Sequence, residues 1–309
     1  MQITNFVKTK VFAIIVLYNP DLIKLRMLVD SVKRQVDSIV LVDNTNDVVS
    51  KNIENEVKTL HCDNVIYLPL HGNFGIAHAQ NVGIKYSKKS FASHFLLLDQ
   101  DSLLPEKMIE NLLHYEKKII DDGIKVAAIG PSFRDEKTGK VTGAIRVYPF
   151  FQKILSNANL PIATDYLIAS GTLINVKSLD VIGMMREDLF IDLVDIEWCA
   201  RARKSGFKCY VAPDVIMNHS IGNEAKKYFG KNVITHSDFR HYFIVRNTIH
   251  LILKRKLTTN HLLFLALRLP LFIIIHIFTS PSKKEKIGLF FMAIKDGIRG
   301  KMGKGILNS

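Results

Sequence analysis

Short apolar runs alternate with stretches of helical periodicity over residues 11–212. The runs are rich in β-branched residues and end abruptly in polar residues, which is typical of strands buried on both faces of a sheet. These predicted strands span 11–17, 39–42, 65–68, 94–98, 125–129, 166–176 and 207–212. Apolar residues that recur every three or four positions predict helices over 22–36, 76–86, 105–120 and 198–204. The alternation of strand and helix predicts an α/β fold with a doubly wound sheet.

Two acidic residues, Asp99 and Asp101, follow the strand predicted over 94–98 (HFLLL). Open α/β sheets bind their ligands at the carboxyl ends of the strands. Mg²⁺ commonly takes one or two protein carboxylates and keeps its other positions for water and phosphate oxygens. The alternative is a polar turn, in which Asp101 and Ser102 cap the helix that begins near Pro105. The pattern alone leaves both interpretations open.

Polar residues also follow two other predicted strands. Asp43 comes after the strand over 39–42, where a carboxylate can accept hydrogen bonds from a base or a ribose hydroxyl. The alternative for Asp43 is an Asx-turn with the residues that follow it. Residues 72–75 (GNFG) open the helix over 76–86, a position that suits anions. This loop lacks the GxGxxG and GKS/T patterns, which argues against a Rossmann dinucleotide site and against a P-loop.

The densest group of acidic residues precedes the helix predicted over 198–204. Asp192, Asp195 and Glu197 fall near its N-terminus, where negative charge complements the helix dipole. Apolar residues separate these acids and indicate partial burial, which raises a carboxyl pKa toward that of a general base. The spacing leaves both explanations standing. His219 follows the last predicted strand and fits a third metal ligand, a phosphate contact or an ordinary loop histidine.

The composition restricts the class of protein. Apolar residues make up 48% of the 309 positions, which is enough for a large core and excludes a disordered chain. The three cysteines show no CxxC spacing, so we expect a reducing, cytosolic setting with neither a zinc site nor a disulfide framework. Residues 1–20 contain a short apolar run without a small-residue cleavage site, which predicts a strand rather than a signal peptide.

Positive charge concentrates near the C-terminal end. Residues 240–309 hold 13 of the 42 Lys and Arg residues but two of the 29 acidic ones, and so carry +11 of the net charge of +13. The pattern over residues 240–256 predicts a helix with apolar and basic faces. An apolar segment follows over 261–278 and contains Arg268 and Pro270. An apolar segment with a central arginine favours an in-plane or re-entrant membrane helix, and a true span stays open.

A last helix is predicted over 283–299, with apolar residues on one stripe and cations elsewhere. This is the pattern of a basic helix that lies in a membrane interface. The alternative is a helix packed on the body of the protein or in an oligomer. Nucleic acid binding would need aromatic platforms or a recognition motif, and the sequence has neither. We therefore expect a membrane surface as the partner of the basic end and leave the oligomeric state open.

Six motifs in a fixed order extend these predictions: IIVLYNP, LVDNT, GNFGIAHAQNVGI, LLLDQDS, FIDLVDIEWCARARKSGF and HSIG. Together they resemble the inverting family 2 glycosyltransferases of the GT-A fold, and in particular the bacterial rhamnosyltransferases that assemble O-antigen and capsule. The resemblance covers residues 10–250. It implies a GT-A catalytic domain with a doubly wound mixed sheet over residues 1–238. It also implies that a helical, membrane-associated extension follows over residues 239–309.

The resemblance also implies which residues bind the nucleotide-sugar donor. Asp43 is expected to bind the nucleotide base or the ribose. The other residues expected around the donor are Asn73, Gly75, Asn81, Asp99, Gln100 and Arg246, of which Arg246 is expected on a phosphate.

By the same resemblance, Asp99 and Asp101 match the DxD pair that holds Mg²⁺ or Mn²⁺, and His219 is a candidate third ligand. Asp195 stands where the family places the base that activates the acceptor. Members of the family often have Glu-Asp at this position, whereas this chain has Val194 and Asp195 there. The alternatives for the base are Asp192 and Glu197.

The implied activity is the inverting, metal-dependent transfer of L-rhamnose from dTDP-rhamnose to a lipid-linked cell-surface glycan. A cation held by carboxylates offsets the charge on the leaving diphosphate, and a further carboxylate takes the proton of the acceptor hydroxyl. The alternatives are transfer of galactose or N-acetylglucosamine from a UDP donor and, from a different class, a metal-dependent nucleotidyltransferase. A catalytically silent membrane scaffold conflicts with the intact acids. The expected place is peripheral or monotopic, on the cytoplasmic face of the bacterial inner membrane.

Overall fold

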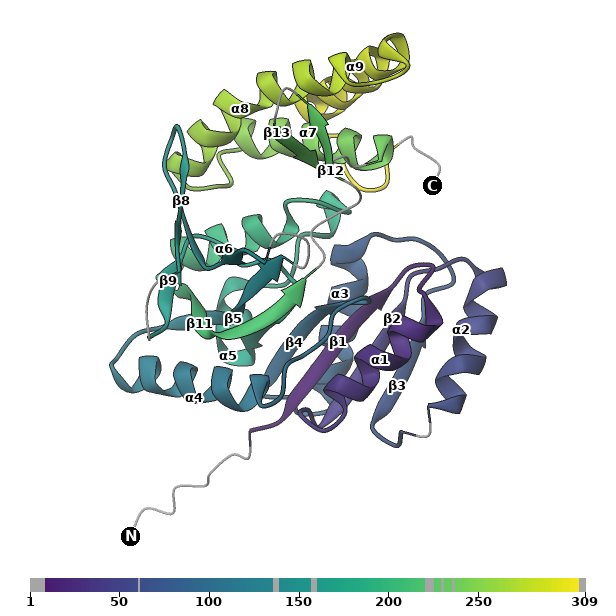
Figure 1. Cartoon of the computed structure of the whole chain (residues 1–309), viewed down its shortest axis with the longest axis vertical. Helices are drawn as coiled ribbons and strands as arrows, with labels where there is room; N and C mark the ends of the chain where they lie inside the picture. The colour runs from purple at the N-terminus through teal and green to yellow at the C-terminus, as the bar shows by residue number, and fades with distance from the viewer. Residues whose placement is uncertain are drawn as a thin grey trace.

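A computed structural model describes residues 9–60, 62–135, 139–156, 160–219, 225–228, 231–234 and 237–305, and for residues 219, 225–228 and 231–234 it describes the backbone alone. A nine-stranded sheet forms the centre of this described part (Figure 1). The order of its strands is β3 (Val65–Pro69), β2 (Ser38–Asp43), β1 (Val11–Leu17), β4 (His94–Asp99), β10 (Thr172–Asn175), β5 (Val126–Asp135), β11 (Lys208–His219) and β9 (Ile162–Thr164), with β6 (Val141–Thr142) paired to β5.

The sheet is mixed. Strands β3, β2, β1 and β4 are parallel neighbours. Strand β10 runs antiparallel between β4 and β5, and β9 runs antiparallel to β11. The predicted α/β fold class is therefore confirmed. Because β2 and β4 run in the same direction, Asp43 and Asp99 come to the same edge of the sheet.

Helices cover both faces of this sheet (Figure 1). They are α1 (Leu22–Val32), α2 (Asp47–Thr59), α3 (Ile76–Lys89), α4 (Met108–Asp121), α5 (Val176–Ile182) and α6 (Val194–Lys204). Helices α1, α2 and α4 contribute to the core on one face, and α3, α5 and α6 to the core on the other. In β1, Phe12 and Ile14 face the α3 side, whereas Ala13 and Ile15 face the α1 side. Burial on both faces explains why this strand reads as an unbroken apolar run.

Several predicted elements have different bounds in the structure, and two of the differences bear on the site. The strand predicted over 166–176 is reduced to β10, because Gly171 has a φ of +77° and turns the chain before the strand begins. Helix α6 begins at Val194 rather than at 198, so Asp195 and Glu197 lie in its first turn.

Several elements have no counterpart in the sequence prediction. Helix α2 and helix α5 are two of them, and the region over 131–164, which shows no clear periodicity, contains short strands. The further elements are the hairpin of β7 (Ala144–Val147) and β8 (Gln152–Leu155), the 3-10 helix η1 (Glu187–Leu189), and the hairpin of β12 (Ala225–Tyr228) and β13 (Lys231–Ile234).

Three helices complete the described chain: α7 (Asp238–Leu253), α8 (Thr259–Phe278) and α9 (Lys283–Arg299). They match the three helices predicted for the basic end and lie together at one end of the molecule (Figure 1). Helix α7 packs against both α8 and α9 and is largely buried. Among the described helices, α8 alone is long and apolar enough to cross a membrane by length and composition, and only a small part of it is buried.

The close crossing of α7 and α9 depends on Gly297. A Cβ at this position would lie 2.7 Å from the backbone oxygen of Arg246 and 2.9 Å from the Cβ of Ile249, so one helix would have to shift. Gly288, in the same helix, has no such neighbour within 4 Å.

We predict that Gly297→Ala lowers the free energy of unfolding by about 1–3 kcal/mol through overpacking. Gly288→Ala should instead raise it by up to about 1 kcal/mol, because alanine favours the helix. Urea unfolding followed by circular dichroism measures both variants. Equal effects of the two substitutions would contradict the close crossing.

Candidate active site

A cavity of about 440 Å³ is lined by residues of α3, β4, α6 and α7. Asp99 lines it from the end of β4, and Asp195 lines it from the first turn of α6. Asp192 and Arg240 contribute a further acid and a cation to the wall. Two acids from distant parts of the sequence thus face one cavity, as the family resemblance implies.

The backbone just before α6 is strained. Phe190, Asp192 and Leu193 have φ values of 65°, 65° and 64°, in the left-handed region that non-glycine residues seldom adopt. Each such residue costs about 1–3 kcal/mol and persists where the surrounding structure fixes it. This sharp turn starts α6 at the position where Asp195 lines the cavity.

Asn247 of α7 fixes the strained segment. Its Nδ2 donates hydrogen bonds to the carbonyl oxygens of Leu189 (3.0 Å), Ile191 (2.8 Å) and Asp192 (3.1 Å). The side chain is fully buried, so these bonds do not compete with water. One amide therefore ties helix α7 to the turn that carries the candidate catalytic acids.

Arg246 lies beside Asn247 and does not line the cavity. It is fully buried, its guanidinium lies 4.6 Å above the Phe243 ring, and it donates to the carbonyl oxygens of Leu189 (3.1 Å) and Gly303 (2.6 Å). The phosphate contact expected for Arg246 thus has no support in this geometry, because the guanidinium binds backbone carbonyls behind the wall.

Asp195 has the surroundings of a general base. Its pKa is raised to about 6, mainly by burial and further by the negative charge of Asp99, while the backbone N–H groups of Ile196 and Ala169 oppose the rise. The N–H of Ile196 donates to Oδ1 at 2.8 Å and orients the carboxylate. A carboxylate with a pKa near 6 is mostly ionised at neutral pH and is a stronger base than an ordinary aspartate.

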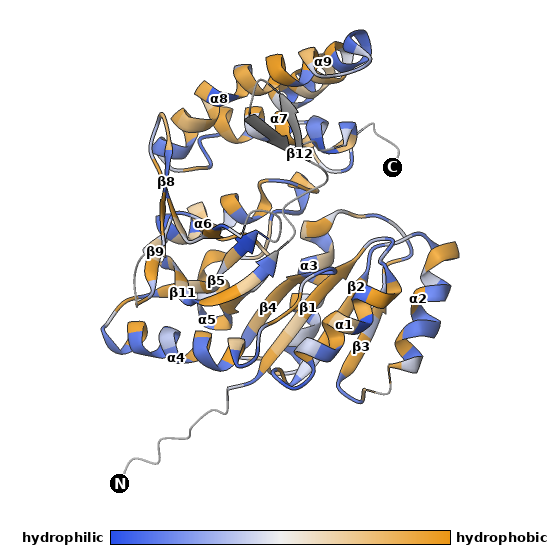
Figure 2. Cartoon of the chain, viewed as in Figure 1, coloured by the Kyte–Doolittle hydropathy of each residue, from blue (hydrophilic) through white to orange (hydrophobic). Residues whose placement is uncertain are grey.

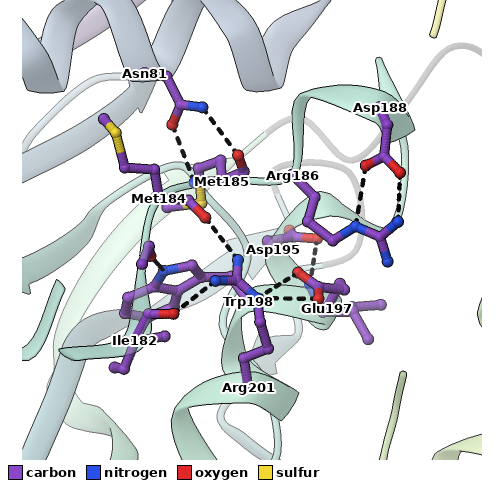
Figure 3. Close-up of polar contacts among 12 residues, drawn as sticks. Asn81, Ile182, Met184, Met185, Arg186, Asp188, Asp195, Glu197, Trp198 and Arg201 are labelled. Carbon is purple, nitrogen blue, oxygen red and sulfur yellow. Dashed lines mark hydrogen bonds and ion pairs between the residues drawn. The ribbon is translucent and has the colours of Figure 1, made fainter. Parts of the chain in front are cut away.

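Glu197, an alternative base, is fully buried away from the cavity. Its two oxygens accept hydrogen bonds from Nε of Arg201 at 3.0 and 2.9 Å. The same guanidinium donates to the carbonyl oxygens of Ile182 (2.8 Å) and Met184 (2.7 Å) (Figure 3). Glu197 therefore fixes α6 to the loop after α5, next to the Trp198 ring that also lines the cavity.

Asp192, the other alternative, lines the cavity but forms a salt bridge with Arg240. Arg240 and Asn247 are both absent from the sequence prediction, which selected Arg246 from this helix. They are seven residues apart, which places them on the same face of α7. That spacing of two polar residues in a largely apolar helix was the available signal.

The loop before α3 is tied to the end of β2. Asn44 Nδ2 donates to Asn73 Oδ1 at 3.1 Å, and the N–H of Phe74 donates to Asn44 Oδ1 at 2.8 Å. Gly75 has a φ of +88°, and a Cβ there would lie 2.6 Å from the backbone oxygen of Phe190. Glycine thus lets this loop contact the strained segment beside the cavity.

Asp43 is fully buried, and its carboxylate is occupied by protein groups. It accepts hydrogen bonds from the hydroxyls of Ser50 (2.5 Å) and Tyr67 (2.6 Å) and from the N–H of Thr45 (3.0 Å). Burial and the bond to Asp43 raise the pKa of Tyr67. The bond from Thr45 corresponds to the Asx-turn alternative, and a contact with a base or ribose would require this cluster to open.

Asn81 and Gln100 also bind the protein itself. Asn81 exchanges hydrogen bonds with the backbone of Met185, at 2.9 and 3.0 Å (Figure 3), and donates to Glu187. Gln100 accepts from the N–H of Tyr18 at 2.7 Å and donates to its carbonyl oxygen at 3.2 Å. Both residues position loops around the cavity, and neither lines it.

The predicted metal ligands are only partly described. Asp99 lines the cavity, and Asp101 is exposed in the turn two residues later. His219 ends β11, but its side chain lies outside the described residues. Within the described part of the chain, no group of three His, Cys, Asp or Glu side chains could hold a metal ion. Two acids near a cavity nevertheless fit Mg²⁺ or Mn²⁺, since such ions use few protein ligands and complete their shell with phosphate oxygens and water.

Comparison with solved structures agrees with the fold. GalNAc-T7 in complex with UDP, GalNAc and Mn²⁺ matches with a TM-score of 0.56 at 15% identity, over 78% of this chain and 51% of that one. The mannosyltransferase PcManGT from Pyrobaculum calidifontis, in complex with GDP-Man and Mn²⁺, matches with a TM-score of 0.53 at 14% identity, over 94% and 79%. The chain thus spans about half the length of GalNAc-T7.

Sequence comparison is more specific. The dTDP-rhamnosyl transferase RfbF of Shigella flexneri is 34% identical over 309 residues, which cover 97% of this chain and 99% of the relative. The family model described as glycosyl transferase family 2 matches residues 12–183, the region that contains β1 through β10. This chain therefore belongs to glycosyl transferase family 2.

Proposed function

We propose that this glycosyltransferase moves L-rhamnose from dTDP-rhamnose to a hydroxyl of a lipid-linked glycan, with inversion at the anomeric carbon. The observation that carries the proposal is that Asp99 and Asp195 face one cavity. The full-length relative named as a dTDP-rhamnosyl transferase supports the choice of donor.

The reaction is a single displacement in this proposal. Asp195 takes the proton of the acceptor hydroxyl, and the acceptor oxygen forms its bond to the anomeric carbon of the sugar. The bond between that carbon and the diphosphate oxygen breaks, and dTDP leaves with the electron pair. Asp195 suits this role because its pKa of about 6 leaves it ionised yet basic at neutral pH.

Asp99 and Asp101 would hold Mg²⁺ or Mn²⁺, and His219 remains the candidate third protein ligand. The cation would offset the negative charge that develops on the leaving diphosphate. Two of the solved GT-A structures similar to this chain contain Mn²⁺, which supports a divalent ion in general.

The donor would enter between the loop that carries Asn73 and Gly75 and the end of β4. Ile76 and Gln80 of α3 line the cavity, so the N-terminal turn of this helix lies close to where a diphosphate would bind. We assign Asn81, Gln100 and Arg246 to the support of this site, because each binds backbone groups around it.

Residues 239–309 would hold the enzyme on the cytoplasmic face of the bacterial inner membrane. Figure 2 shows apolar residues along both α8 and α9 at the end of the molecule. The exposed apolar residues of α8 lie on one face: Leu263, Leu267, Leu271, Ile274 and Phe278. The exposed cations nearby are Arg268, Lys283, Lys284, Lys295, Arg299 and Lys301. Apolar faces flanked by cations bind anionic lipid surfaces.

We predict that Asp195→Asn lowers kcat by about 10²–10⁴-fold while donor affinity stays the same, because the variant loses only proton transfer. In the wild type, kcat should fall as the pH drops below about 6, since protonation removes the base. Release of dTDP from dTDP-rhamnose, followed over a pH series, measures both effects. An active Asp195→Asn variant together with an inactive Asp192→Asn variant would assign the base to Asp192. Turnover with UDP-galactose or UDP-N-acetylglucosamine, and none with dTDP-rhamnose, would contradict the proposed donor.

We predict that Asp99→Asn abolishes the gain in dTDP affinity that Mn²⁺ gives the wild type, a loss of about tenfold or more. Calorimetric titration of dTDP with and without Mn²⁺ measures this gain, and Asp101→Asn tests the second acid in the same titration. Asp121→Asn, an exposed acid at the end of α4, is the matched control. A metal-dependent gain that survives in both variants would rule out the proposed ligands.

Membrane binding is best tested on exposed residues, because removal of α9 would uncover the buried Tyr242 of α7, whose hydroxyl donates to Asp296 of α9. Leu271→Gln and Phe291→Gln should each lower binding to vesicles of phosphatidylethanolamine and phosphatidylglycerol by about tenfold. Phe91→Gln, at the opposite end of β4 from Asp99, is a matched control that should bind like the wild type. Flotation of the vesicles measures binding, and unchanged flotation of both tail variants would refute the membrane proposal.

A further inference from the structure

The tip of the β7–β8 hairpin carries exposed aromatic side chains. The tip spans residues 148–151, and the N–H of Tyr148 donates to the carbonyl oxygen of Phe151 at 2.9 Å. The rings of these two residues stack, with centroids 4.8 Å apart. Phe150 is 78% exposed. A large aromatic surface at a hairpin tip, away from any core, calls for a partner.

Strand β7 is firmly attached up to the residue before the tip, so the tip is presented in a defined place. Asp165 accepts hydrogen bonds from the N–H of Val147 (2.7 Å) and from Arg146 (3.2 Å). Strand β7 also packs against β9, β11 and α8. A fixed tip retains little conformational entropy to lose on binding.

Tyr166 contacts both the hairpin and helix α8. Tyr166 accepts a hydrogen bond from Gln152 at the start of β8 (3.3 Å), and its ring packs 5.8 Å from the ring of His261 in the first turn of α8. The hairpin extends from the sheet toward α8 in Figure 1. The aromatic tip and the exposed apolar face of α8 therefore lie at the same end of the molecule.

The charge of the hairpin region favours an anionic partner. Residues 139–156 contain Lys140, Arg146 and Lys153 and no acidic residue. Arg146 pairs with Asp165, and Lys153 is exposed on β8, two residues after the tip. Aromatic rings next to cations match the interface of an anionic bilayer, where amphipathic rings settle at headgroup level.

We propose that residues 148–151 form a second membrane contact, which inserts into the same anionic lipid surface as α8. The inference rests on the proposed membrane binding of the tail and adds a separate contact from the catalytic part of the chain. A second contact on a different element restrains the tilt of the enzyme on the membrane more than the helix pair does alone. The tip thereby orients the catalytic cavity toward a lipid-linked acceptor.

A tryptophan placed at the tip reports insertion directly. The chain has a single tryptophan, Trp198, which is buried, so its signal can be subtracted. Phe150→Trp reports the tip, Leu271→Trp reports α8, and Phe91→Trp reports a site 86% exposed at the opposite end of the sheet. Each variant is titrated with vesicles of phosphatidylethanolamine and phosphatidylglycerol that contain brominated lipid, which quenches inserted indoles.

We expect quenching and a blue shift at positions 150 and 271 and neither at position 91. Quenching at 271 without quenching at 150 would overturn the hairpin proposal and leave the membrane binding of the tail intact. No quenching at either position would refute both. A concentration-dependent blue shift at 150 without vesicles would instead identify a second copy of the chain as the partner.

A second test removes the aromatic side chains of the tip and compares the result with a control variant. Phe150→Ser combined with Phe151→Ser should lower vesicle binding by about tenfold, whereas Phe91→Ser should leave it unchanged. Both variants should keep the wild-type rate of dTDP release with a soluble acceptor, because the tip does not line the catalytic cavity. Loss of that rate in the double variant would assign the tip to the acceptor site and overturn the proposal.

Discussion

The arrangement of the candidate active site depends on the hydrogen bonds from Asn247 to the backbone of residues 189–192. An amide that binds three carbonyls in the interior has no water competing for it, and loss of the amide would remove a hydrogen-bond donor from each of those carbonyls. These bonds hold a segment whose backbone is otherwise unfavourable at three positions. The direction in which α6 starts, and with it the place of Asp195, follows from that constraint.

The same constraint explains why the C-terminal helices and the catalytic fold form one unit. Helix α7 supplies Asn247 and Arg246 to the segment before α6, and it supplies Arg240 to Asp192 in the cavity wall. Helix α9 in turn packs closely on α7 at Gly297. A membrane contact made by α8 and α9 would therefore be connected mechanically to the wall of the cavity.

The acids of the site show that surroundings, rather than residue type, decide what a carboxylate can do. Asp195 faces the cavity with its pKa raised by burial and by Asp99, which makes it basic. Glu197 is two residues away on the same helix, yet it binds Arg201 in the interior and fixes the helix. Asp43 ends its strand much as Asp99 does, but Tyr67 and Ser50 occupy its oxygens. Sequence position brings acids to the edge of the sheet, and packing then decides which of them bind protein groups and which face the cavity.

Much of the fold could be predicted from the sequence because buried strands leave a clear signal. The run over 11–17 became β1 without change, since both of its faces are buried and every position is apolar. Helix α2 was missed, because only Ser50 and Ile53 of its 13 residues are buried and so its apolar stripe is thin. The candidate site could be predicted as a region but not in detail. The roles of Arg240 and Asn247 depend on contacts with residues some 50 positions away, which local spacing does not encode.

Helix α8 illustrates how tertiary contacts decide a question that hydropathy leaves open. Its 20 residues are long and apolar enough for a membrane span. Yet α8 packs along α7, which is tied to the catalytic segment, and beside α9, which exposes Lys283, Lys284 and Lys295. If α8 spanned a bilayer, these cations would move toward the hydrocarbon. The free-energy cost is about 2.5–3.5 kcal/mol for each cation at the centre of the bilayer. An orientation in the plane of the membrane buries the exposed face of α8 and keeps the cations among the headgroups, so the packing favours the in-plane helix.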